Sequence, residues 1–137
     1  MAPLRLPVLI ETIENQSEHL RGLAEIPSAD LLRDPVRLAA VKYFFVVAIE
    51  AAIDASRHVA IGLGLRSAQN FADAFVVLGE AGRLDGDLVA RLQAMARFRN
   101  LLVHGYAVVD DARVVEILAT RLGDLDDFRR QIAAAMS

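Results

Sequence analysis

A dense group of chemically capable side chains occupies residues 97–106, in the run Arg97-Phe98-Arg99-Asn100-Leu101-Leu102-Val103-His104-Gly105-Tyr106. A guanidinium such as that of Arg99 binds phosphate through two parallel hydrogen bonds and keeps its charge at any working pH. Histidine exchanges protons near neutrality, so His104 could act as a general base or acid. Together, and without a metal ion, these two groups suit the attack of an RNA 2′-hydroxyl on the adjacent phosphate.

The spacing of Arg99 and His104 limits how they can cooperate. Five residues place them ~140° apart around an ideal helix and ~7.5 Å apart along it, so they do not converge on one ligand unaided. The reach of the arginine, a distorted helix end before Gly105, or a second protomer could bring them together. On these residues alone a structural alternative stays open, in which the arginine caps a helix and the histidine ends one.

The remaining histidines carry weaker signals. His19 is expected on a polar helix face in solvent. His58 follows Asp54 by one helical turn, so the two side chains can hydrogen-bond along the helix surface, a pairing that is more often structural than catalytic. No carboxylate or second histidine stands at ligand spacing around His104, and no phosphate-binding glycine loop is present. The sequence therefore predicts neither a metal site nor a cofactor.

Helices must position these residues, since no segment shows the pattern of a strand. The expected helices cover about residues 7–24, 35–61, 70–80, 85 or 87 to 105, and 110 or 111 to 136, with residues 27–34 as a loop or short turn. Proline or capping residues mark the starts, and glycines mark the ends. Short connections favour antiparallel neighbours, so we predict an all-α, up-and-down bundle of about five helices in a single domain over residues 1–137.

The second expected helix is apolar around most of its circumference, because the apolar residues at 41 and 44–49 cannot share one stripe. It is therefore either the central helix of the bundle or buried on a second side by a partner, and a homodimer would explain the excess. A membrane span is disfavoured by charged residues and a histidine within this stretch, namely Lys42, Glu50, Asp54, Arg57 and His58. Residues 1–10 lack an export signal, so a cytoplasmic protein is expected.

Composition narrows the function classes. The 137 residues include no cysteine, which excludes a disulfide scaffold and thiolate chemistry. Hydrophobic residues make up 55% and the formal net charge is −3, which argues against disorder and against broad, sequence-blind nucleic-acid binding. A small local anion site remains compatible with that average.

The segment from Arg99 to Tyr106 resembles the R-N-x-x-V-H-x-Y signature of HEPN-domain toxins of the HepT type. The resemblance extends further, because residues 48–54 followed by His58 are similar to the second helix of that family and residues 73–82 to its third. It covers roughly residues 35–130, in the family's order, and every signature position is filled.

This resemblance implies a HEPN-like homodimer that acts as the toxin of a type VII (HEPN/MNT) toxin–antitoxin system. Such toxins are metal-independent RNA endonucleases that carry an R-x4-H-x-Y motif in the cleft between protomers. Arg99 would hold the scissile phosphate, His104 would act as general base or acid, and Asn100 would orient the phosphate or the histidine. Tyr106 would be the site at which an MNT-type minimal nucleotidyltransferase antitoxin attaches AMP.

Two copies of the motif facing each other would gather Arg97, Arg99 and their symmetry mates in one groove, which reconciles RNA binding with an acidic chain. Arg97 is therefore expected to bind substrate. Asp54 and His58 are expected to lie near this groove and to support the residues that contact the substrate. Two alternatives remain. One is a non-catalytic HEPN module that binds a nucleotide or serves as a scaffold for the nucleotidyltransferase. The other is a purely structural helical dimer.

Overall fold

The structure is a computed structural model that describes residues 5–135, and its regular elements in that range are all helical. They are α1 (Arg5–Ala24), α2 (Ser28–Leu32), α3 (Pro35–Gly62), α4 (Phe71–Glu80), α5 (Gly86–His104), the 3-10 turn η1 (Tyr106–Val108), α6 (Asp111–Thr120) and α7 (Leu122–Ala135). The predicted all-α fold is confirmed. None of the helices in the described range combines the length and the apolar character that crossing a bilayer requires.

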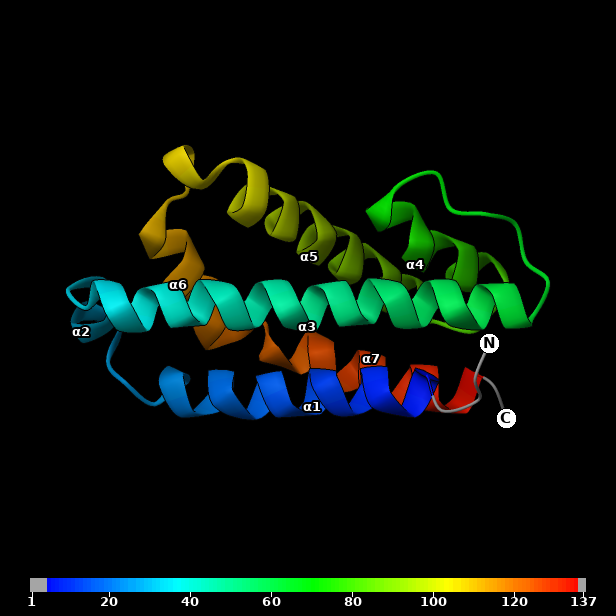
Figure 1. The fold of residues 1–137 in the computed structure, drawn as a ribbon, viewed down its shortest axis with the longest axis horizontal. Helices are drawn as coiled ribbons and strands as arrows, with labels where there is room; N and C mark the ends of the chain where they lie inside the picture. The colour runs from blue at the N-terminus through cyan, green and yellow to red at the C-terminus, as the bar shows by residue number, and fades with distance from the viewer. Residues whose placement is uncertain (1–4, 136–137) are drawn as a thin grey trace.

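Helix α3 is the centre of the bundle. Figure 1 shows it crossing the molecule with α1 and α7 on one side and α4 and α5 on the other. Its start is set by Asp34, whose Oδ1 accepts a hydrogen bond from the Arg37 N–H at 3.0 Å, followed by Pro35 at the first helical position. Its end is set by Gly64, which takes a positive φ of 70°. A central position accounts for most of the apolar circumference of this helix.

Two stretches differ from the sequence prediction. Residues 27–34, expected as a loop or short turn, contain the five-residue helix α2, which is anchored by the fully buried Leu31. The last expected helix is broken at Arg121 into α6 and α7, although neither proline nor glycine occupies the break. The break lets α6 pack on α2 while α7 lies along α1 and α3, so that each helix buries its own apolar face. Met136 lies outside the described residues.

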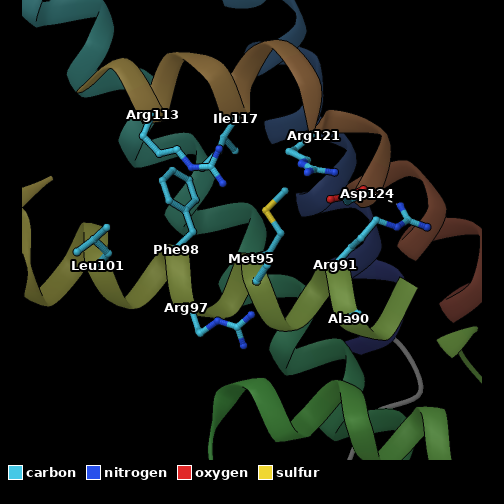
Figure 2. Close-up of a pocket in the computed structure, with 11 residues that line it drawn as sticks. Ala90, Arg91, Met95, Arg97, Phe98, Leu101, Arg113, Ile117, Arg121 and Asp124 are labelled. Carbon is cyan, nitrogen blue, oxygen red and sulfur yellow. Dashed lines mark hydrogen bonds and ion pairs between the residues drawn. The ribbon is translucent and has the colours of Figure 1, made fainter. Parts of the chain in front are cut away.

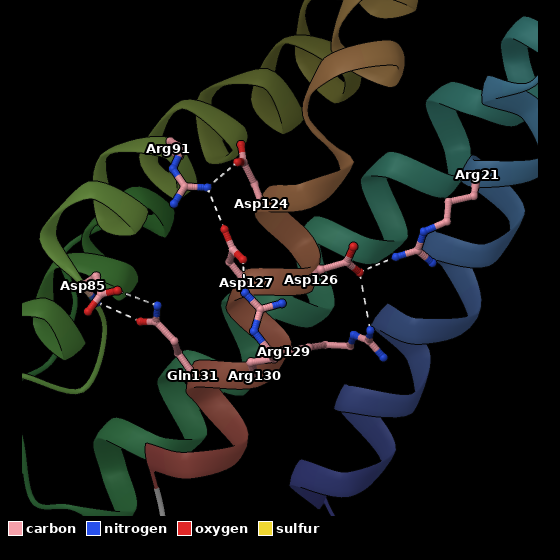
Figure 3. Close-up of polar contacts among 9 residues, drawn as sticks. All are labelled: Arg21, Asp85, Arg91, Asp124, Asp126, Asp127, Arg129, Arg130 and Gln131. Atoms are coloured by element: carbon pink, nitrogen blue, oxygen red, sulfur yellow. Dashed lines mark hydrogen bonds and ion pairs between the residues drawn. The ribbon is translucent and has the colours of Figure 1, made fainter.

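The N-terminal half of α5 is fastened to α7 by polar contacts, which Figure 3 shows. The backbone N–H of Asp85 donates to Gln131 Oε1, and Gln131 Nε2 donates to Asp85 Oδ2, both at 2.8 Å. Six residues further along, Arg91 Nη1 donates to Asp124 Oδ1 at 2.6 Å and to Asp127 Oδ2 at 3.1 Å. These contacts fix the N-terminal half of α5, the helix whose C-terminal turns carry Arg99 and His104.

Apolar contacts hold the other faces of α5. The Phe98 ring meets Phe45 of α3 edge-on, with ring centroids 5.3 Å apart. Helix α4 approaches closely at Gly79, where an added Cβ would lie 2.8 Å from Val89 Cγ2. Helix α5 therefore packs against both α3 and α4 on the side from which Arg99 extends.

Candidate active site

The side chain of Arg99 extends from α5 to Glu50 of α3, and only 12% of it is exposed. Its Nε donates to Glu50 Oε2 at 2.9 Å and its Nη2 donates to the same oxygen at 2.5 Å. Its guanidinium carbon lies 4.9 Å from the centre of the Phe71 ring, at the start of α4. Helices α3, α4 and α5 together therefore fix the position of this arginine.

Asn100, predicted to orient the phosphate or the histidine, contacts the arginine. Arg99 Nη1 donates to Asn100 Oδ1 at 3.1 Å. Three of the five guanidinium N–H groups of Arg99 are thereby engaged, and one N–H on each Nη is left. Two N–H groups, one on each Nη, thus remain for hydrogen bonds to an anion such as a phosphate group.

A small cavity of about 200 Å³ lies beside this arginine, lined by Glu50, Ile53, Asp54, Arg57, Phe71 and Arg99. Asp54, a predicted supporting residue, therefore lies next to Arg99. Arg57 approaches Phe71 as well, with its guanidinium carbon 5.8 Å from the ring centre. Two arginines and two carboxylates thus line the cavity, which leaves it close to electrically neutral.

His58 is half-buried on α3, and within the described residues it makes no hydrogen bond with Asp54. The structure therefore does not reproduce the pairing that the one-turn spacing allowed. His19 is exposed, as expected, and stacks on Phe44 with ring centroids 4.8 Å apart.

His104 is exposed in the last turn of α5, where the helix ends at Gly105. The Gly105 N–H still donates to the Leu101 carbonyl at 2.8 Å. A Cβ at Gly105 would lie 2.7 Å from Leu101 Cδ1 and 3.1 Å from that carbonyl oxygen, so a side chain at this position would crowd the helix end. The motif histidine is thereby presented at a sharply terminated helix end.

Within one chain, the motif residues are not all brought together. Arg99 and Asn100 are hydrogen-bonded to each other, whereas no hydrogen bond joins Arg99 to His104 in the described part of the chain. The backbone of Tyr106 opens η1 directly after the motif, and its side chain lies outside the described residues. The arrangement at Arg99 and His104 agrees with the helical spacing, which keeps the two side chains apart on one helix.

Arg97 lies away from the Arg99 cavity. It lines a separate groove of about 510 Å³ between α5 and the α6–α7 segment, which Figure 2 shows. The predicted concentration of charge therefore divides within one protomer between two sides of α5. Within residues 5–135, no three His, Asp or Glu side chains are grouped as a metal site.

Sequence reasoning missed Glu50 and Phe71 as part of the site. The signal for Glu50 was present, because it is a charged residue in an apolar helix at four and seven residues before Asp54 and Arg57. Those intervals place three charged side chains on one helical stripe. Phe71 carried no such signal, since an aromatic residue at a helix start is normally a packing residue.

Known proteins are similar to this chain in sequence and in fold. A family model described as "Ribonuclease HepT-like" matches residues 13–132. A predicted RNase of Archaeoglobus fulgidus is 31% identical over 96 residues, which is 70% of each chain.

Among solved structures, the tri-AMPylated Shewanella oneidensis HEPN toxin in complex with MNT antitoxin superimposes with a TM-score of 0.89 and 23% identity. The alignment covers 98% of this chain and 99% of that one. A toxin–antitoxin structure with AMP-PNP gives a TM-score of 0.84 at 21% identity, over 96% and 99% of the two chains. At these identities the two structures establish a common fold.

Proposed function

Since the chain belongs to the HepT-like ribonuclease family, we propose that it is the toxin of a type VII toxin–antitoxin pair and a metal-independent RNA endonuclease. One observation carries the proposal. A partly buried arginine, fixed by Glu50 and Asn100 with two N–H groups remaining, is followed five residues later by an exposed histidine at a helix end. An oriented guanidinium and an accessible proton-transfer group are the two parts that metal-free phosphodiester cleavage requires.

The active form is a homodimer. The long hydrophobic residues that remain exposed include several on the N-terminal half of α3, the last turns of α5, and η1, namely Val36, Tyr43, Leu101, Val103 and Val108. These segments lie toward the same end of the molecule in Figure 1. Burial of this surface by a second copy would place two motifs across a two-fold axis, so that the arginine of one protomer and the histidine of the other serve one phosphate.

Cleavage begins when His104 accepts the proton of the RNA 2′-hydroxyl. The 2′-oxygen forms a bond to the adjacent phosphorus, and the bond from phosphorus to the 5′-oxygen breaks. The departing oxygen is protonated by an imidazolium, which leaves a 2′,3′-cyclic phosphate and a 5′-hydroxyl end. Arg99 binds the non-bridging oxygens and stabilises the charge that they gain in the transition state.

Neutralisation takes place at Tyr106, which follows His104 by two residues. The cognate MNT-type nucleotidyltransferase transfers AMP from ATP to the tyrosine oxygen and releases pyrophosphate. The added nucleotide brings bulk and negative charge to the end of α5, where it excludes RNA sterically and electrostatically. The Shewanella oneidensis structure, in which an AMPylated HEPN toxin is bound to an MNT antitoxin, supports this regulation.

The test of cleavage is an RNA degradation assay in EDTA with chemical analysis of the new ends. His104→Ala and Arg99→Ala should each reduce the rate by ~10²-fold or more, and His19→Ala, which alters an exposed histidine on α1, should not. Cleavage that survives in the His104→Ala protein would exclude histidine catalysis. RNA binding without new ends in the wild type would favour the non-catalytic module instead.

The test of regulation is intact-mass analysis after co-expression with a cognate MNT-type nucleotidyltransferase. The wild type should gain one or more AMP units, and Tyr106→Phe should gain none. Tyr43→Phe, which alters the exposed tyrosine of α3, is the matched control and should behave as the wild type.

A further inference from the structure

The groove between α5 and the α6–α7 segment has a volume of about 510 Å³. Its lining includes four arginines and one aspartate, namely Arg91, Arg97, Arg113, Arg121 and Asp124. The chain as a whole has a formal net charge of −3, so positive charge is locally concentrated here. The lining therefore has the sign that an anionic ligand requires.

The arginines of the groove differ in how completely neighbouring carboxylates neutralise their charge. Arg91 is held by Asp124 and Asp127 and is committed to the structure. Among the described residues Arg113 pairs only with Glu116, three residues away on the same exposed helix face, and such pairs are weak. Arg97 and Arg121 form no ion pair with any described residue. Three arginines are thus available to a ligand.

The floor of the groove is apolar. Figure 2 shows Arg113 and Ile117 of α6 extending toward Phe98 and Met95 of α5, with Arg97 along the opposite edge of α5. A lone phosphate would gain nothing from an apolar floor. An unpaired nucleotide would, because its base has an apolar face as well as a charged backbone. The paired bases of a duplex could not reach this floor.

The groove continues toward the motif histidine. The α5 residues that line its outer edge are Ala90, Ala94, Arg97 and Leu101, at intervals of four, three and four residues. The next position of that stripe is His104, so one face of α5 leads from the arginines to the histidine. Arg97 and His104 are ~10 Å apart along the helix axis. A strand lying in the groove would therefore reach the reacting phosphate.

We propose that the α5–α6/α7 groove binds unpaired nucleotides of the RNA substrate that flank the cleaved phosphate. Arg97, Arg113 and Arg121 bind backbone phosphates, and bases lie against Met95, Phe98 and Ile117. This assignment rests on the proposed function, since it takes His104 as the site of cleavage. It implies that the protein cleaves single-stranded or looped RNA in preference to duplex.

The test measures RNA binding in full-length His104→Ala protein, which keeps the oligonucleotide intact. The affinity of a labelled single-stranded RNA is determined at several salt concentrations for this protein and for the same protein carrying Arg113→Gln and Arg121→Gln. Loss of two phosphate contacts should weaken binding about tenfold and lower the salt slope by ~1.4. The matched control carries Arg5→Gln and Arg33→Gln, two exposed arginines outside the groove, and should bind as the parent.

Two further comparisons separate the effect of charge from the effect of RNA structure. Arg113→Lys with Arg121→Lys retains the charge and should retain most of the salt slope, and the single variant Arg121→Gln serves if the double variant fails to fold. A duplex of the same sequence should bind more weakly than the single strand.

Equal affinity and slope for the groove variant and its control would overturn the assignment while the proposed function stood, provided that wild-type protein cleaves RNA. Normal RNA binding combined with loss of the nucleotidyltransferase complex would also overturn it and make the groove a protein-docking site. Absence of both RNA binding and RNA cleavage in the intact protein would instead refute the proposed function.

Discussion

A single carboxylate oxygen of Glu50 accepts two hydrogen bonds from Arg99, at 2.9 Å from Nε and 2.5 Å from Nη2. The pair joins α5 to the central helix and neutralises an arginine whose side chain is only 12% exposed. Glu50 therefore determines where the guanidinium lies and which of its N–H groups remain for a ligand. In the proposed ribonuclease, Glu50 is a positioning residue that acts through Arg99.

Replacement of Glu50 should reduce turnover more than substrate binding. In Glu50→Ala the guanidinium keeps its charge and loses its orientation, so kcat should fall about tenfold with a smaller change in KM. Glu50→Gln keeps an acceptor and should retain more activity. Steady-state RNA cleavage separates the two parameters, and Glu11→Ala, an exposed change on α1, is the control. An unchanged kcat in Glu50→Ala would remove Glu50 from the site.

Asp124→Asn should destabilise the fold by about 1–3 kcal/mol, because Arg91 loses the charge of its more buried partner. Only 8% of the Asp124 side chain is exposed, against 30% for Asp127. Asp127→Asn should therefore cost less, about 0.5–1 kcal/mol. Urea unfolding of both variants checks the order, and a larger loss for Asp127→Asn would contradict it.

Two glycine-to-alanine changes should have opposite signs. In Gly79→Ala the new Cβ would lie 2.8 Å from Val89 Cγ2, and the resulting overpacking should cost about 1–2 kcal/mol in spite of the better helix propensity. Gly22 lies in α1 with no neighbouring atom within 4 Å of an added Cβ. Gly22→Ala should therefore stabilise the protein by about 0.5–1 kcal/mol. Thermal unfolding distinguishes them, and equal shifts would show that α4 and α5 can move apart.

Asp73 should make stability fall in acid. Hydrogen bonds from Arg66 and from the Gln69 N–H lower the pKa of Asp73 from 3.8 to about 2. Because the folded pKa lies below the unfolded one, the stabilisation is present above about pH 4 and is lost as the pH falls toward 2. Its size is of the order of 1 kcal/mol, since Arg66 is partly exposed and screened.

Urea unfolding across that pH range should show a shallower pH dependence for Asp73→Asn than for wild type, and Arg66→Gln should flatten it in the same way. A full wild-type slope in Asp73→Asn would assign the acid sensitivity to other carboxylates.

Helix starts in this protein were predictable where the capping residue is adjacent in sequence. Asn70 caps α4 by accepting from the Asp73 N–H at 2.8 Å, and Asp34 with Pro35 starts α3, as local rules require. The break at Arg121 was not predicted, because the apolar pattern runs on across it and α6 and α7 pack on different neighbours. Capping residues nearby in the sequence determine where these helices begin. Tertiary packing determines whether a continuous apolar pattern forms one helix or two.

The site also contains residues that the sequence predicts and residues that only the packing of the helices brings together. The motif residues were predicted from their own order along α5, and in the structure Arg99 donates a hydrogen bond to Asn100. Glu50 is separated from Arg99 by 49 residues, so only the packing of α3 against α5 makes it a partner. The placement of Arg97 on the other side of α5 likewise follows from helix packing, since two arginines two residues apart point to different faces.

The contacts from Asp85 and Arg91 to α7 fasten α5 at one end, while Leu101, Val103 and His104 at the other end are exposed. From Arg91 to His104 the helix extends ~20 Å, so a tilt of only ~5° at the fastened end would displace the tip by ~2 Å. A misplacement of ~1 Å can cost a catalyst ~10²-fold in rate. The reaction rate of the proposed enzyme should therefore be sensitive to salt bridges ~20 Å from His104, and in the proposed dimer the second protomer would hold the end of α5 in place as well as supply side chains.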